Sequence, residues 1–145
     1  MTHKLNCILL VDDDEPTNFI SNMLLEEAAC CNHIQVEESG KAALEYLTQS
    51  NRTTIDDPEG LPYPDLIFLD INMPAMNGWE FLEKYRELSP RLKKTVVIIM
   101  LTTSINPDDK LRADYIPFVS GFANKPLTST MIRGLLREHF MINNE

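Results

Sequence analysis

The sequence predicts an α/β fold in which a doubly wound parallel sheet of five strands carries helices on both faces. Short apolar runs alternate along the chain with stretches of helical periodicity, which is the pattern of βαβ units. The runs are apolar at consecutive positions, as in Leu66 to Leu69, and this is typical of strands buried on both faces. A length of 145 residues, 43% of them hydrophobic, suits a single domain at 1–145 with its own core.

Five strands and five helices are predicted in alternation. The strands are expected at 5–11, 33–37, 65–70, 95–101 and 118–122. The helices are expected at 17–30, 40–50, 78–88, 107–114 and 128–140. The first helix opens after Pro16, a residue favoured at helix starts. Its apolar residues have the spacing of one helix face: Phe19, Ile20, Met23 and Leu24.

Apolar side chains of two later helices are interpreted as core packing, and none of them requires a cofactor. The helix at 78–88 contributes Trp79, Phe81, Leu82 and Tyr85. The buried face of the last helix is expected to consist of Met131, Ile132, Leu135 and Leu136.

The segment 51–64, between the second helix and the third strand, is predicted to be an inserted loop. It contains three prolines and one glycine and has little periodicity. Long surface loops add little closure entropy, so a tolerated surface insertion is favoured over a partner-specific contact.

Composition excludes several classes of function. A net charge of -9 argues against direct binding to nucleic acid, which requires clustered Lys and Arg. The apolar runs are too short to span a membrane, and the N-terminus has no signal-peptide pattern. The three cysteines lack metal-ligand spacing and are interpreted as thiols in a reducing cytoplasm.

An acidic cluster, Asp12 to Glu15, directly follows the first predicted strand. Adjacent carboxylates repel one another unless a cation lies among them, and ligand sets made only of oxygen suit Mg²⁺ or Mn²⁺. The alternative is a solvated acidic helix start, in which the carboxylates interact favourably with the helix dipole. The cluster alone leaves both interpretations open.

Three further predicted strands also end on polar groups. Asp70 ends the third strand, Thr102 follows the fourth, and Lys125 follows the fifth. The carboxyl ends of parallel strands lie at one edge of the sheet, where open α/β sheets bind their ligands. A metal site, a hydroxyl donor and an ammonium group around Asp70 would suit a phosphoryl group.

With these residues in this order, the chain resembles a response-regulator receiver domain from about Lys4 to about Phe140. The matching residues are Asp12-Asp13, Asp70 within Asp-Ile-Asn-Met-Pro-Ala-Met-Asn-Gly, Thr102 in Met-Leu-Thr-Thr, and Lys125-Pro126. The resemblance implies a flavodoxin-like strand order, 2-1-3-4-5, which places the first and third strands side by side. Asp12, Asp13 and Asp70 would then converge at the topological switch point.

The resemblance also implies roles at the acidic end of the site. Asp70 would be the nucleophile and phosphoacceptor, taking a phosphoryl group from a phosphohistidine. Asp12 and Asp13 would hold Mg²⁺ together with Asp70, and Asn72 would add its backbone carbonyl. Because Asp14 follows directly, Asp13-Asp14 stays open as an alternative ligand pair.

Further roles concern the phosphoryl group and the switch. Thr102 would bind a phosphoryl oxygen, with Thr103 beside it, and Lys125 would pair with Asp70 or its phosphoryl group. Phe122 matches the switch aromatic of the family. The resemblance implies no enzyme, but a phosphoacceptor with weak self-catalysed phosphorylation and dephosphorylation.

The expected partners follow from the same resemblance. The phosphoryl donor would be a sensor histidine kinase or a phosphotransfer protein. Only Met141 to Glu145 follow Phe140, so the chain is predicted to be a stand-alone receiver whose output is a change in binding. The face formed by 107–114, 118–122 and 128–140 would contact an unknown downstream protein or a second copy of the chain.

Two other families share some of these features. A haloacid-dehalogenase-type phosphatase also uses an Asp nucleophile, a Ser/Thr and a Lys, but it needs a further acidic metal site, and no Asp follows Lys125. A flavodoxin-like FMN binder would need a phosphate loop after the first strand, where Asp12 to Glu15 would repel the phosphate.

Overall fold

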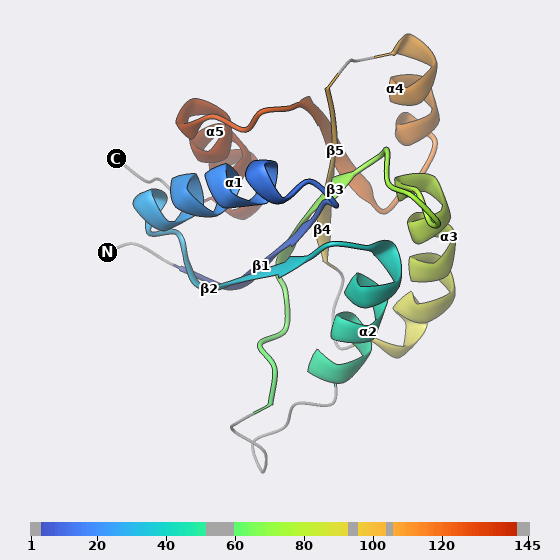
Figure 1. Cartoon of the computed structure of the whole chain (residues 1–145), viewed down its shortest axis with the longest axis horizontal. Helices are drawn as coiled ribbons and strands as arrows, with labels where there is room; N and C mark the ends of the chain where they lie inside the picture. The colour runs from blue at the N-terminus through green and yellow to red at the C-terminus, as the bar shows by residue number, and fades with distance from the viewer. Residues whose placement is uncertain (1–3, 52–59, 93–95, 104–105, 142–145) are drawn as a thin grey trace.

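The computed structural model describes residues 4–51, 60–92, 96–103 and 106–141 and confirms the predicted fold. Five parallel strands form one sheet in the order β2-β1-β3-β4-β5. The strands are β1 (Leu5–Val11), β2 (Cys31–Glu37), β3 (Leu66–Asp70), β4 (Val97–Thr102) and β5 (Val119–Asn124). The α-helices are α1 (Glu15–Ala28), α2 (Gly40–Ser50), α3 (Gly78–Leu88), α4 (Pro107–Asp114) and α5 (Ser129–Phe140). Helices α1 and α5 lie on one side of the sheet and α2 and α3 on the other (Figure 1).

The helix starts have physical causes that explain the small shifts from the predicted ranges. Helix α1 begins two residues before the predicted 17 because Asp14 is its N-cap and accepts a hydrogen bond from the Thr17 N–H at 3.1 Å. Helix α5 begins after Thr128, whose hydroxyl oxygen accepts from the Met131 N–H at 3.1 Å. Strand β5 extends beyond the predicted 122, to Asn124.

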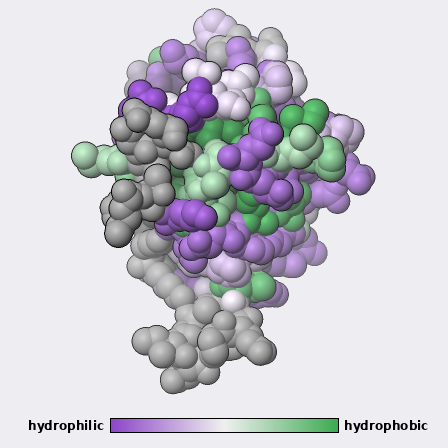
Figure 2. All heavy atoms as spheres, turned by 90° about the vertical axis from the view of Figure 1, so that its left-hand side faces the viewer, coloured by the Kyte–Doolittle hydropathy of each residue, from purple (hydrophilic) through white to green (hydrophobic). Residues whose placement is uncertain are grey.

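Most of the apolar face predicted on the first helix is exposed, and of its four residues Leu24 packs against the core. Phe19, Ile20 and Met23 are 67%, 50% and 48% exposed, whereas α1 buries Asn18, Ser21 and Leu25. The side-chain amide of Asn18 donates a hydrogen bond to the Asp12 backbone carbonyl at 2.8 Å. This bond satisfies the polar side chain at its inward, buried position. Figure 2 shows apolar surface among hydrophilic side chains on the side of the molecule where α1 and α5 lie.

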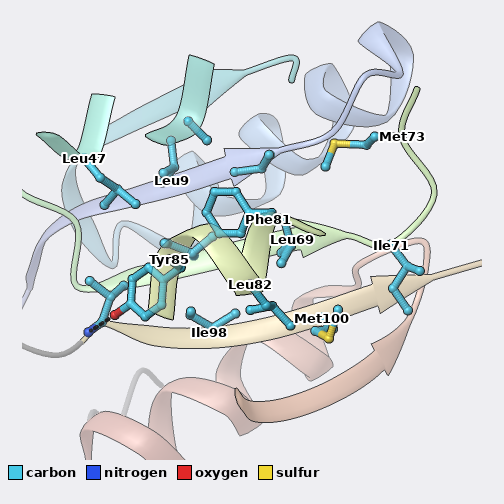
Figure 3. Close-up of a cluster of buried hydrophobic side chains, with 14 of the residues drawn as sticks. Leu9, Leu47, Leu69, Ile71, Met73, Phe81, Leu82, Tyr85, Ile98 and Met100 are labelled. Atoms are coloured by element: carbon cyan, nitrogen blue, oxygen red, sulfur yellow. Dashed lines mark hydrogen bonds between the residues drawn. The ribbon is translucent and has the colours of Figure 1, made fainter. Parts of the chain in front are cut away.

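The sheet separates two hydrophobic clusters. Phe81, Leu82 and Tyr85 of α3 point into the cluster that lies on the α2 and α3 side (Figure 3). The Tyr85 hydroxyl accepts a hydrogen bond from the Val96 N–H at 3.3 Å, so its polar end is satisfied within the core. The predicted packing role of this helix is confirmed, and full burial of each such side chain contributes about 1.5–3 kcal/mol.

The second cluster lies under α1 and α5. Of the predicted face of α5, Ile132 and Leu136 are buried, while Met131 and Leu135 pack against the cluster half-buried. The strands between the two clusters are therefore covered on both faces, as their continuous apolar sequences predicted.

The end of the predicted loop at 51–64 contacts the sheet and α2, while residues 52–59 lie outside the described residues. The Tyr46 hydroxyl of α2 donates to the Pro62 carbonyl at 2.6 Å, and the Asn6 side-chain amide of β1 donates to the Tyr63 carbonyl at 3.0 Å. Tyr63 itself is buried in the α2 and α3 cluster. These contacts fix where the chain enters β3.

Candidate functional site

The ends of four strands place the predicted site residues at one edge of the sheet. Strands β1 and β3 are neighbours, so Asp12, directly after β1, lies near Asp70, the last residue of β3. Thr102 ends β4, and Lys125 directly follows β5. Because all five strands are parallel, these ends share one side of the sheet.

Three carboxylates come together at this edge. Oxygen atoms of Asp12, Asp13 and Asp70 all lie within 4.8 Å of one another. Asp12 and Asp70 are buried, and Asp13 is exposed. A compact group of carboxylate oxygens with one member open to solvent has the donor chemistry that Mg²⁺ prefers, with room for water ligands.

Asp14, the alternative ligand, has a different task. Its carboxylate accepts hydrogen bonds from the N–H and the hydroxyl of Thr17 at the start of α1. These hydrogen bonds lower the pKa of Asp14. The residue that continues the acidic run is thus a helix cap, while Asp13 points toward the group that contains Asp70.

Lys125 neutralises the buried part of the acidic group. Its Nζ donates to Asp12 Oδ2 at 2.8 Å and lies 3.2 Å from Asp70 Oδ1. Burial alone would lower the pKa of Lys125, but the hydrogen bond and the negative charges of Asp12 and Asp70 outweigh burial and raise it. The lysine is therefore held as a cation between the two carboxylates.

The surroundings of Asp70 oppose the ionisation of its carboxyl group. Burial, and then the charge of Asp12, raise the pKa of Asp70 to about 6, and Lys125 offsets part of that rise. A carboxylate that is ionised at neutral pH but weakly solvated is a better nucleophile than one at an exposed surface.

The loop after Asp70 is fixed by close backbone packing. The Ile71 N–H donates to the Leu101 carbonyl at 3.1 Å, and the Gly78 N–H donates to the Ile71 carbonyl at 2.8 Å. A Cβ at Gly78 would lie 2.8 Å from the Asp70 carbonyl oxygen. Only glycine allows α3 to begin this close to Asp70.

The capping of α3 adds to this rigidity. Asn77 accepts a hydrogen bond from the Glu80 N–H at 2.9 Å, and the Glu80 carboxylate accepts from the Asn77 N–H at 3.0 Å. This reciprocal capping box fixes the first turn of α3. The order Asn77-Gly78-Trp79-Glu80, with the capping asparagine three positions before the glutamate, is the sequence signal of this helix start.

The remaining predicted site residues surround this centre at different depths. Thr102 is buried, and its backbone carbonyl accepts from the Lys125 N–H at 2.7 Å. Thr103 is exposed, and Asn72 is exposed two residues after Asp70. Phe122 is half-buried on β5, where it pairs with Met100 of β4 and packs against the α2 and α3 cluster.

A buried asparagine that sequence reasoning missed supports the same loop. Asn18 of α1 holds the backbone carbonyl of Asp12 and so fixes the point where the chain leaves β1. Its inward position on α1 was concealed because the next two residues, Phe19 and Ile20, are apolar.

Among the described residues, no helix has the length and apolar character needed to cross a lipid bilayer.

The chain is similar to known signalling proteins along nearly its whole length. It is 30% identical to the probable methanogenesis regulatory protein FilR2 of Methanothrix harundinacea, with 90% of this chain and 79% of that protein covered. It is 32% identical to the response regulator Rcp1 of Synechocystis, with 70% of this chain and 65% of Rcp1 covered.

Solved structures show the same fold. A two-component response regulator from Cytophaga hutchinsonii superposes with a TM-score of 0.83 at 28% identity, covering 94% of this chain and 97% of that one. The family model described as the response regulator receiver domain matches residues 8–137, which include every strand end described above. The chain therefore belongs to the response regulator receiver domain family of two-component signalling.

Proposed function

We propose that this chain is a phosphoacceptor that takes a phosphoryl group from a histidine kinase or a phosphotransfer protein onto Asp70. The observation that carries the proposal is the position of Asp70. Its buried carboxylate lies 3.2 Å from the Lys125 ammonium and within 4.8 Å of the carboxylates of Asp12 and Asp13. Family membership supports the same assignment.

The residues suit this transfer. An Asp70 carboxylate oxygen would attack the phosphorus, the P–O bond would form as the P–N bond of the phosphohistidine breaks, and the imidazole nitrogen would recover its electron pair. Asp12, Asp13, Asp70 and the Asn72 carbonyl would hold Mg²⁺, which would neutralise charge on the transferring oxygens. Lys125, already beside Asp70, would pair with one phosphoryl oxygen, and the Thr102 hydroxyl would donate to another.

The surface beside the site supports contact with a donor protein. Exposed Phe19, Ile20 and Met23 lie on α1. Ile20 also lines a cavity of about 220 Å³ together with Thr103 and Lys125. These exposed apolar side chains of α1, of which Ile20 shares the cavity with Lys125, would let a donor exclude water while its histidine approaches.

The output would be a change on the face formed by α4, β5 and α5. A phosphoryl group on Asp70 would attract the Thr102 hydroxyl, and the movement of the chain after β4 would change the packing of Phe122. Leu111 and the neighbouring Tyr115 are 56% and 80% exposed on this side of the molecule. They would offer contact area to a downstream protein or a second copy of the chain.

Intact-mass spectrometry after incubation with acetyl phosphate and Mg²⁺ tests the proposal. The parent chain should gain one phosphoryl group, and Asp70→Asn should gain none. Asp114→Asn, which changes an exposed acid at the end of α4, is the matched control and should behave as the parent. Phosphorylation that persists in Asp70→Asn or without a divalent metal would refute the assignment.

A further inference from the structure

A groove of about 450 Å³ lies between α3 and the segment that joins α4 to β5. One stripe of α3 faces it, formed by Trp79, Leu82 and Arg86 at positions i, i+3 and i+7. Arg112, Tyr115 and Phe118 line it from α4 and the following chain. None of these residues belongs to the group around Asp70.

The floor of the groove is apolar and fixed by the core. Trp79 and Leu82 are 8% and 2% exposed, so most of each side chain packs inward. Phe118 packs against the buried Tyr85, with 5.5 Å between the ring centroids. At the rim, Tyr115 is 80% exposed. The groove therefore combines a rigid aromatic floor with an aromatic side chain that is free to cover a ligand.

The charge of the lining is opposite to that of the whole chain. Arg86 and Arg112 bring two guanidinium groups against one carboxylate, Glu83, although the chain has a net charge of -9. The Arg112 guanidinium carbon lies 4.5 Å from the centroid of the Trp79 ring. A guanidinium stacked on one ring can stack a second planar group on its other face while its N–H groups bind an anion.

We propose that this groove binds a small organic anion with an extended aromatic ring system. Its volume falls within the roughly 300–1,000 Å³ of small-molecule sites, which combine an apolar lining with a few polar groups that orient the ligand. Aromatic rings of the ligand would stack on the outer face of the Arg112 guanidinium, which itself covers Trp79, and would lie beneath Tyr115, while the anionic group would lie between Arg86 and Arg112. The acidic site around Asp70 would repel the same ligand, so the two sites are chemically separate.

Two dyes that differ only in charge test this proposal. 8-Anilinonaphthalene-1-sulfonate has the expected ring system and an anionic group, and N-phenyl-1-naphthylamine is the same molecule without the sulfonate. Trp79 is the only tryptophan of the chain, so quenching of its fluorescence reports occupancy of the groove. The anionic dye should quench saturably with one site per chain and bind about tenfold or more tightly than the neutral dye.

Three variants locate the site. Arg86→Gln and Arg112→Gln should each weaken binding of the anionic dye at least about fivefold, each titrated against its own baseline, with little effect on the neutral dye. Arg137→Gln changes an arginine on α5 that is also exposed, and this variant should bind as the parent. Equal affinity for the two dyes, or equal weakening in all three variants, would overturn the proposal. Both measurements use unphosphorylated protein, so they are independent of the function of Asp70.

Discussion

Lys125 joins the end of β5 to the end of β1 through a 2.8 Å contact with Asp12, although β3 and β4 separate these two strands in the sheet. The lysine thus crosses the carboxyl edge of the sheet above the strand that ends in Asp70. Its removal would leave two buried carboxylates close together without a cation.

We expect Lys125→Met to lower the free energy of unfolding by about 3 kcal/mol in the absence of divalent metal, because an uncompensated buried charge is strongly destabilising. Urea denaturation followed by circular dichroism would measure the change. Lys41→Met, at an exposed position of α2, is the control and should shift stability by less than about 0.5 kcal/mol. Equal stability of the Lys125 variant and the parent would show that the contact carries no net energy.

A second prediction separates the two possible acidic pairs. Asp13→Asn should weaken Mg²⁺ binding at least about tenfold, since it removes one carboxylate from the proposed ligand group. Asp14→Asn should leave the affinity near that of the parent, because asparagine can still cap α1. Titration of Trp79 fluorescence with Mg²⁺ measures both variants. Comparable loss of affinity in Asp13→Asn and Asp14→Asn would favour the pair Asp13-Asp14.

The third prediction concerns transmission from the site to the output face. Thr102→Ala should still accept a phosphoryl group but should lose the NMR shift changes around Phe122 that follow phosphorylation, because no hydroxyl remains to be drawn toward the phosphoryl oxygen. Thr103→Ala, at the adjacent exposed position, should keep those changes. If Thr102→Ala gives the same shifts around Phe122 as the parent, the coupling must use another route.

Two glycines in helices give opposite predictions for the same substitution. Gly78→Ala places a Cβ 2.8 Å from a backbone oxygen of Asp70 and should destabilise the protein by about 1–3 kcal/mol, because the start of α3 must shift. Gly134→Ala on α5 meets no atom within 4 Å and should stabilise it by about 0.5–1 kcal/mol through its helix propensity. Thermal denaturation distinguishes the two results, and destabilisation of similar size in both variants would contradict the packing described at Asp70.

Alkaline pH should destabilise the chain in part through Cys7. Burial raises the pKa of the Cys7 thiol to about 11, so the folded state favours the neutral thiol, while the unfolded chain ionises near pH 9. The stabilisation that the folded state gains from the neutral thiol is fully present below pH 9 and is lost as the pH rises toward 11. Between pH 8 and pH 10 it amounts to about 1 kcal/mol.

Urea denaturation of the parent and of Cys7→Ala at both pH values, under reducing conditions, measures this contribution. The variant should lose about 1 kcal/mol less than the parent over the interval. Identical losses would assign the pH dependence to other groups, such as Tyr46, whose pKa burial also raises.

The parallel sheet was predictable because consecutive apolar residues mark strands that are covered on both faces, whereas its strand order came from the resemblance to receiver domains. The buried face of α1 was not, since its inward positions include Asn18 and Ser21, and a polar residue is stable there only when the fold supplies a partner. For Asn18 that partner is the Asp12 carbonyl, which becomes available only once β1 and α1 pack together.

The candidate site was also predictable only in part. The positions of Asp12, Asp70, Thr102 and Lys125 at strand ends followed from the pattern of the sequence. That Lys125 contacts Asp12 more closely than Asp70 depends on the tertiary course of the chain between β5 and α5 and has no local signal. The groove beside Trp79 was likewise not predictable from the sequence. Its residues come from α3 and from α4 with the chain that follows it, and β4 separates these segments in the sequence.

Helix α4 buries a single residue, Ala113, whereas every residue of β3 is buried. Over evolutionary time, most positions of α4 can therefore be substituted with little effect on folding, while almost any change in β3 disturbs packing on both of its faces. Descendants of such a chain can acquire new partners through α4 without altering the strand that carries the reactive carboxylate.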